Sequence, residues 1–196
     1  MYVPKTSHHI QQRIKNSRFI ATAEPFDEPR TVKTRIAEVR RAHPGCAHVV
    51  YAFSVGGEKT RSFGMSDDGE PKGTAGRPVL DVLWGSEITD CLVTVVRFFG
   101  GTKLGTGGLV RAYGGAAREV LAELPTMPLV ATVEFAVTVS YGSYEPVRRI
   151  LAEFRANITS EEFGEAVRVA GTLPSSNVRG CSEALREATS GSVELL

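Results

Sequence analysis

A glycine-rich, basic stretch at residues 97–118 (RFFGGTKLGTGGLVRAYGGAAR) has the composition of a surface that binds anions. It holds seven glycines and four basic residues, and no acidic residue lies among them. Glycine is unfavourable in the interior of a helix. Many glycines between a strand and a helix therefore indicate that the backbone amides there closely approach another group. Free N–H groups at a helix N-terminus attract phosphate. The residues that we expect to bind anions or nucleic acid are Arg97, Lys103, Gly105, Thr106, Gly107, Gly108, Arg111 and Arg118.

This stretch matches neither of the two common nucleotide-binding motifs. A Walker A loop needs a lysine directly after its last glycine, whereas Lys103 precedes Gly105 and is followed by Leu104. A Rossmann fingerprint needs a third glycine where Val110 stands. One structural alternative stays open, in which the glycines serve only to let a strand and a helix pack tightly together.

An acidic segment at residues 66–70 places three carboxylates, Asp67, Asp68 and Glu70, within four residues. The Asp-Asp-Gly sequence favours a turn in which aspartate side chains cap backbone amides. The carboxylates could instead pair with Arg97, Lys103 or Arg111, ordering the glycine-rich loop or taking part in recognition. A magnesium site or acid–base chemistry is the third possibility, although the EF-hand spacing is missing. Thr74, in the glycine turn that follows, is expected to cap a helix. We group it with Asp67, Asp68 and Glu70 as a residue for loop ordering or recognition.

Nothing in the sequence marks a catalytic centre. It has no GxSxG motif, its histidines do not follow zinc-binding spacing, and its three cysteines show no nucleophile signature. We therefore expect no catalytic residue, bound metal or cofactor. An odd number of scattered cysteines, no secretory signal and no apolar run of about 18 residues favour a cytoplasmic protein without a membrane segment.

The hydrophobic pattern predicts two α+β domains, residues 1–125 and 129–196, joined near Pro125 and Pro128. The first domain is expected to contain a hairpin of strands 10–14 and 18–23, helices at 31–42 and from 74, strands 47–55, 60–64 and 90–98, and a helix at 107–124. The second shows the order β-α-β-β-α-β of a ferredoxin-like domain. Its expected elements are residues 129–140, 144–155, 157–163, 165–173, 176–189 and 192–196.

Two long segments, SDDGEPKGTAGRPVLDVL (66–83) and VVRFFGGTKLGTGGLVRAYGGAA (95–117), resemble the signature of the IMPACT/YigZ family. The resemblance implies that the first domain adopts the ribosomal-protein-S-five domain-two-like fold, related to domain IV of elongation factor G. It implies a ferredoxin-like second domain similar to the last domain of that factor. Eukaryotic relatives act in translational control, and bacterial members are suspected of binding nucleic acid or ribosomes.

Together these features predict a non-enzymatic factor associated with RNA or the ribosome, or with a translation-associated protein. Basic side chains would neutralise phosphates while the glycine-rich loop brings backbone amides close. One alternative is an enzyme acting on a phosphorylated small molecule, with magnesium at the acidic segment. A second is a protein–protein interaction module that uses the helix face formed by glycine and arginine.

Overall fold

The computed structural model describes residues 1–57, 60–189 and 191, and the chain divides into two compact units, Met1–Leu129 and Val130–Leu196. Each unit has its own hydrophobic core. Both combine helices with antiparallel sheets, which confirms the expected α+β class. The units are called unit 1 and unit 2 below, and each is described by itself.

Unit 1 is built on a five-stranded antiparallel sheet in the order β2-β3-β6-β4-β5. Its first two strands form a hairpin whose turn, Lys15 and Asn16, has positive φ at both residues, as a tight two-residue turn requires. Strand β6 lies at the centre and is buried along nearly its whole length. The strands are β2 (His8–Ile14), β3 (Ser17–Pro25), β4 (His48–Val55), β5 (Ser62–Ser66) and β6 (Cys91–Phe98).

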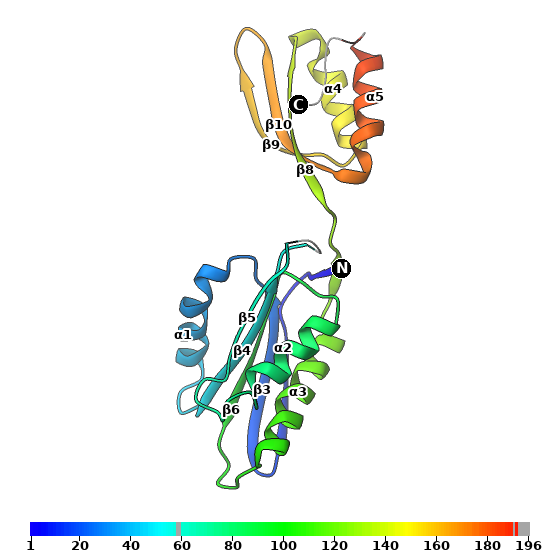
Figure 1. The fold of residues 1–196 in the computed structure, drawn as a ribbon. Helices are drawn as coiled ribbons and strands as arrows, with labels where there is room; N and C mark the ends of the chain where they lie inside the picture. The colour runs from blue at the N-terminus through cyan, green and yellow to red at the C-terminus, as the bar shows by residue number, and fades with distance from the viewer. Residues whose placement is uncertain (58–59, 190, 192–196) are drawn as a thin grey trace. The chain divides into compact units, whose positions relative to one another are not determined.

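Helices cover both faces of this sheet (Figure 1). Helices α2 (Gly76–Gly85) and α3 (Thr106–Ala122) lie on one face, where apolar side chains of both helices join those of β3, β4 and β6 in the larger core. Helix α1 (Val32–Ala42) lies on the other face, preceded by a 3-10 turn, η1 (Pro29–Thr31), and packs Val32 near Phe53 and Leu92. Strand β1 (Tyr2–Pro4), from the start of the unit 1 sequence, pairs with strand β7 (Thr126–Pro128) from its end.

Unit 2 contains a three-stranded antiparallel sheet in the order β8-β10-β9, with both of its helices on one face (Figure 1). This order agrees with the first three strands of a ferredoxin-like sheet. The strand expected at residues 192–196 lies outside the described residues. The elements are β8 (Thr132–Val139), α4 (Tyr141–Glu153), β9 (Asn157–Phe163), β10 (Val167–Pro174), the 3-10 turn η2 (Ser175–Asn177) and α5 (Val178–Ala188).

Candidate nucleic-acid interface

The glycine-rich loop between β6 and α3 is fastened to the turn of the β2–β3 hairpin. A Cβ atom at Gly100 would lie 2.1 Å from the backbone carbonyl of Asn16, so no side chain fits at this position. The Gly100 N–H also donates a hydrogen bond to the Ser17 hydroxyl at 3.3 Å. The high glycine content of this segment is therefore partly explained by a close backbone-to-backbone approach. That approach joins the loop to a hairpin turn, and it is not the packing of a strand against a helix that the sequence left open.

The N-terminus of α3 nevertheless remains exposed. Gly105 precedes the helix with φ of +72°, a conformation that glycine adopts without strain, and no side chain caps the first turn. Gly105, Thr106 and Gly107 are exposed, while Gly108 is half-buried. The first-turn amides carry the positive end of the helix dipole and lack intrahelical partners. This arrangement suits an anion.

Lys103 and Arg111 are the two predicted cations that lie nearest to this helix end. Lys103 is exposed in the loop, and Arg111 is exposed one turn into α3. Among the described residues, neither forms an ion pair with a carboxylate. Their charges are therefore available to a ligand.

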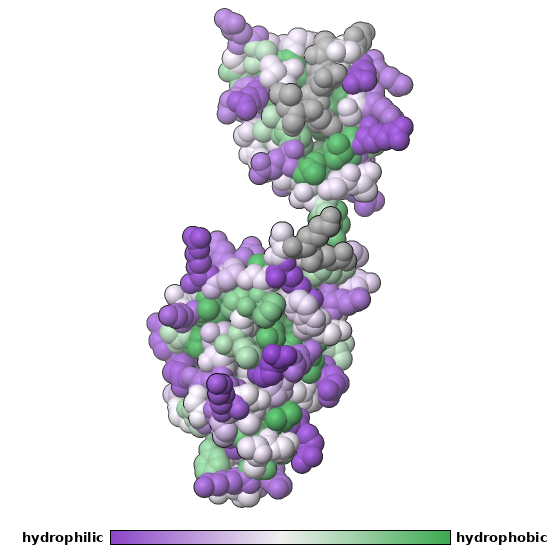
Figure 2. All heavy atoms as spheres, viewed as in Figure 1, coloured by the Kyte–Doolittle hydropathy of each residue, from purple (hydrophilic) through white to green (hydrophobic). Residues whose placement is uncertain are grey.

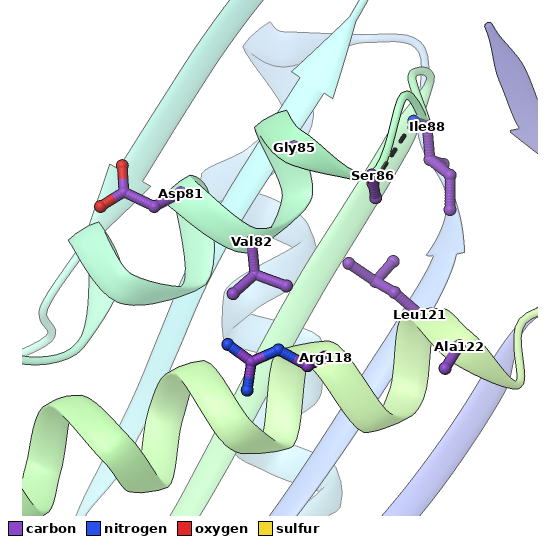
Figure 3. Close-up of a pocket in the computed structure, with 8 residues that line it drawn as sticks. All are labelled: Asp81, Val82, Gly85, Ser86, Ile88, Arg118, Leu121 and Ala122. Carbon is purple, nitrogen blue, oxygen red and sulfur yellow. Dashed lines mark hydrogen bonds between the residues drawn. The ribbon is translucent and has the colours of Figure 1, made fainter.

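Arg118 is exposed as well, but it lies far from the start of α3. Twelve residues separate it from Thr106, which corresponds to about 18 Å along the helix. Figure 3 shows its side chain extending from α3 toward Val82 of α2. There it lines a hollow of about 580 Å³ whose walls include Val82, Ile88 and Leu121. Arg118 is thus an exposed cation, as predicted, but it does not lie beside the N-terminus of α3 with Lys103 and Arg111.

Arg97 is not available to an external phosphate, which corrects the prediction. Its side chain is only 5% exposed, and its guanidinium donates a hydrogen bond of 2.6 Å to the Glu70 carboxylate. A second nitrogen donates to Ser17 at 3.3 Å, and the Phe19 and Phe99 rings lie 5.5 Å away. Arg97 follows Cys91, Val93 and Val95 at every second position of β6, and it is therefore directed to the face that α2 and α3 cover.

Glu70 is the centre of this buried network. Besides Arg97, the Tyr113 hydroxyl of α3 donates to the same carboxylate oxygen at 2.7 Å. Burial, followed by the hydrogen bond to Glu70, raises the pKa of Tyr113, so the phenol remains protonated as a donor. The predicted pairing of the acidic segment with Arg97 is thus present, and it joins that segment, β6 and α3.

Asp67 caps helix α2 from a distance in the sequence. Its carboxylate accepts hydrogen bonds from the backbone amides of Gly73, Ala75 and Gly76 at 2.8–3.1 Å. Thr74, which was expected to cap this helix, is buried and donates its hydroxyl to the Pro71 carbonyl at 2.6 Å. The prediction for Thr74 was therefore wrong, because the preceding turn brings a stronger, charged acceptor to the same amides.

The cap predicts an acid-sensitive contribution to stability. Burial opposes ionisation of Asp67, but the three amide donors outweigh it and lower the pKa of the carboxyl below its ordinary value of 3.8. A depressed folded-state pKa gives stability that is present above 3.8 and is lost as pH falls further. We expect Asp67→Asn to lower the free energy of unfolding by about 1 kcal/mol at pH 7. Urea unfolding should show this difference shrinking below pH 4, and a constant difference would contradict the prediction.

The Asp68 carboxylate has different hydrogen-bond partners from those of Asp67 and Glu70. Its carboxylate accepts hydrogen bonds from the Arg40 guanidinium and from the Val49 amide, both at 2.5 Å. The Asp68 carbonyl lies 2.7 Å from Nδ1 of His48. The three carboxylates of the acidic segment therefore face an amide cluster, an α1 arginine and a buried arginine respectively. Within the described ranges, no group of His, Cys, Asp and Glu side chains is arranged to hold a metal ion.

The sequence reasoning overlooked basic residues contributed by the β2–β3 hairpin. Arg13 and Lys15 are exposed, and among the residues with a described structure neither pairs with a carboxylate. Lys15 lies in the turn itself, whereas Arg13 leaves β2 on the sheet face opposite to Ile10 and Ile14, away from α3. Their turn contacts the glycine-rich loop at Gly100, and Gln12 donates to the Ala112 carbonyl of α3 at 3.5 Å. The tight turn around Asn16 was recognisable, but its position beside a loop more than 80 residues later was not.

Within the parts of the chain that are described, no helix combines the length and apolar character that crossing a bilayer requires. Residues 15–121 match the Impact N-terminal domain, and residues 137–192 match DUF1949, a domain of unknown function.

The chain is similar over nearly its whole length to curated bacterial proteins. It is 33% identical to the IMPACT family member YigZ of Escherichia coli, covering 99% of this chain and 96% of that protein. It is 34% identical to an IMPACT family member of Haemophilus influenzae, covering 96% and 92%. A crystal structure of a hypothetical protein aligns with a TM-score of 0.78 at 33% identity, covering 100% of this chain and 95% of that one. By these matches, which cover both of its units, the chain belongs to the IMPACT family.

Proposed function

We propose that unit 1 binds RNA through its exposed cationic end, as part of a role in translation. The observation that carries this proposal is the grouping of unpaired cations around an uncapped helix N-terminus. Lys103, Arg111 and the α3 amides supply one side of the surface, and Lys15 in the adjacent hairpin turn supplies the other. This set is called the cationic end below.

The three carboxylates of the acidic segment support the assignment because each of them already has other partners. Glu70 is buried against Arg97, and Asp67 and Asp68 accept hydrogen bonds from amides and from Arg40. None of the three faces the cationic end as a free counter-charge. Positive charge without compensating acids attracts phosphates over distances of several ångströms. The contacts are to phosphate and backbone, so we expect little discrimination between base sequences.

Unit 2 offers less to RNA. Sheets that read single-stranded RNA do so with exposed aromatic side chains that stack on bases. In unit 2 the apolar residues Val167, Val169 and Leu173 are buried, so the alternate positions of β10 form the opposite face of the sheet. There Ala170 pairs with Ala136 and Ser160, small residues that provide no stacking platform. We therefore place RNA binding in unit 1.

The link to translation rests on the family. The chain shares the IMPACT domain and full-length similarity with bacterial members, and the resemblance implies translational control for the eukaryotic relatives. Ribosomal or translation-associated RNA, encountered in the cytoplasm, is the proposed ligand. The enzyme alternative loses its main support, because the carboxylates that would hold magnesium have other partners.

Salt dependence gives a direct test. If three or four phosphates are neutralised, the logarithm of the association constant for single-stranded RNA should fall with the logarithm of salt concentration with a slope of about −2 to −3. Fluorescence anisotropy with a labelled 20-nucleotide RNA of mixed sequence, between about 50 and 200 mM KCl, measures this slope. No binding at 50 mM KCl, or a slope near zero, would refute the proposal.

A further inference from the structure

The second candidate surface lies at the opposite edge of the unit 1 sheet, on strand β5. The sheet order makes β2 and β5 its two edge strands. Each edge leaves every second residue with N–H and C=O groups that have no partner strand. Proteins normally protect such edges with charged residues, proline or bulges, because an open edge readily pairs with another chain.

Strand β5 shows none of these protective features. Its sequence is Ser-Phe-Gly-Met-Ser, without charge or proline, and its pairing with β4 proceeds without a register shift. Strand β2, the other edge, is instead polar and carries histidine, glutamine and Arg13. The two edges of one sheet therefore differ, and β5 is the edge without charge, proline or bulge. Its last residue, Ser66, has its backbone packed against Gly76 of α2.

An apolar surface lies directly beside this open edge. Phe63 and Met65 of β5 are 54% and 42% exposed, and Trp84 of α2 is 50% exposed. The Phe63 and Trp84 rings meet edge-to-face with centroids 5.3 Å apart. Together with Leu80, Arg77 and Asp81 they line a hollow of about 180 Å³. Figure 2 shows hydrophobic residues near β5 on this face, with hydrophilic residues over α2 beside them.

The surface around the hollow is held in place before any partner arrives. The Arg61 guanidinium lies 4.5 Å from the centre of the Trp84 ring. The same group donates hydrogen bonds to the Ser54 hydroxyl at 2.6 Å and to the Ile88 carbonyl at 2.7 Å. A rigid aromatic wall loses little conformational entropy on binding, which favours recognition.

The size of the patch favours a short segment over a second copy of the chain. Three large side chains of roughly 200 Å² each, about half exposed, offer on the order of 300 Å² of apolar surface. A stable dimer of ordinary size buries about 800 Å² on each partner. An added strand needs less apolar area, because main-chain hydrogen bonds supply part of its affinity and side-chain pockets supply its specificity.

We propose that β5 is a docking edge for an extended segment of a partner protein, which adds a sixth strand to the unit 1 sheet. Alternate residues of the segment hydrogen-bond to the free backbone groups of β5. An apolar side chain of the segment fills the hollow that Phe63, Leu80 and Trp84 line. This site is distinct from the cationic end and does not depend on RNA binding.

The test uses the full-length protein and a phage-displayed library of random ten-residue peptides. We expect selected peptides to carry apolar residues at alternate positions. A synthetic peptide is then methylated at one backbone nitrogen at a time. Strand addition predicts losses of about 10- to 30-fold at every second position and small effects between them. This scan leaves the protein unchanged, so it does not depend on a variant that folds.

Protein variants provide the matched comparison. Phe63→Ser should weaken peptide binding about 10-fold or more, whereas Gln11→Ser on the β2 edge should leave it unchanged. The Lys103→Ala/Arg111→Ala variant should bind peptide normally, so failure of the RNA proposal would not affect this one. The proposal is overturned if the library yields no peptide, if the methylation scan shows no two-residue period, or if light scattering shows a dimer that Phe63→Ser dissociates.

Discussion

Glu70→Ala is expected to lower the free energy of unfolding of unit 1 by about 3–5 kcal/mol, the cost of removing one partner of a buried ion pair. The variant leaves the Arg97 guanidinium buried without a counter-charge, and it leaves the Tyr113 hydroxyl without an acceptor. Both groups are almost completely enclosed, so water cannot replace the lost carboxylate. Urea unfolding followed by the fluorescence of Trp84, the only tryptophan and a member of unit 1, measures the loss.

Two comparisons isolate the effect of the buried charge. Asp81→Ala removes an exposed ion pair with Arg77 and should cost no more than about 0.5 kcal/mol. Removing both buried charges, as in Glu70→Leu/Arg97→Met, should cost less than the sum of the two single changes, because no unpaired charge remains. A loss of less than 1 kcal/mol for Glu70→Ala would show that this network does not stabilise the fold.

Lys103→Ala/Arg111→Ala is expected to weaken RNA binding about 25-fold at 0.1 M salt and to reduce the salt slope by about 1.4. Each phosphate contact with single-stranded nucleic acid contributes about 0.7 to the slope, which corresponds to about 0.7 decades of affinity between 1 M and 0.1 M salt. Both residues are exposed and unpaired among the described residues, so the fold should not change. Anisotropy titrations at four or five KCl concentrations give both quantities.

The matched control removes the same amount of charge elsewhere on unit 1. Arg30 and Lys33 are exposed at the start of α1, which lies on the other face of the sheet (Figure 1). Arg30→Ala/Lys33→Ala should reduce affinity by less than threefold through the change in net charge alone. Equal losses for the two double variants would mean that binding depends on total charge and not on the cationic end.

Local patterns predicted the elements of unit 1 well because hydrophobic periodicity and turn residues act over short distances. The hairpin around Asn16 and the strand at 47–55 correspond to β2–β3 and to β4 (His48–Val55). The helix near residue 74 was predicted to begin with Thr74 as its capping residue, whereas in the structure the Asp67 carboxylate caps α2. A carboxylate nine residues upstream is brought to the helix only when the intervening turns have formed.

At the candidate site, too, local sequence patterns did not predict which residues tertiary packing brings together. Four basic residues look equivalent in the sequence, but the fold places them on three different elements: strand β6, the loop that follows it, and helix α3. Arg97 is directed inward from β6 to Glu70, while Lys103 and Arg111 remain exposed. Lys15 joins the site only through tertiary packing of two turns. Residue type therefore indicated the kind of chemistry, and topology determined which residues take part.

The contact between Gly100 and Asn16 has a consequence for anyone who redesigns this end of the molecule. The two backbones meet so closely that a side chain at position 100 has no space, so a change in the path of either turn must be matched by the other. Transplanting the glycine-rich loop into a related scaffold requires the matching hairpin tip as well. For protein engineering, these two distant segments form a single exchangeable part.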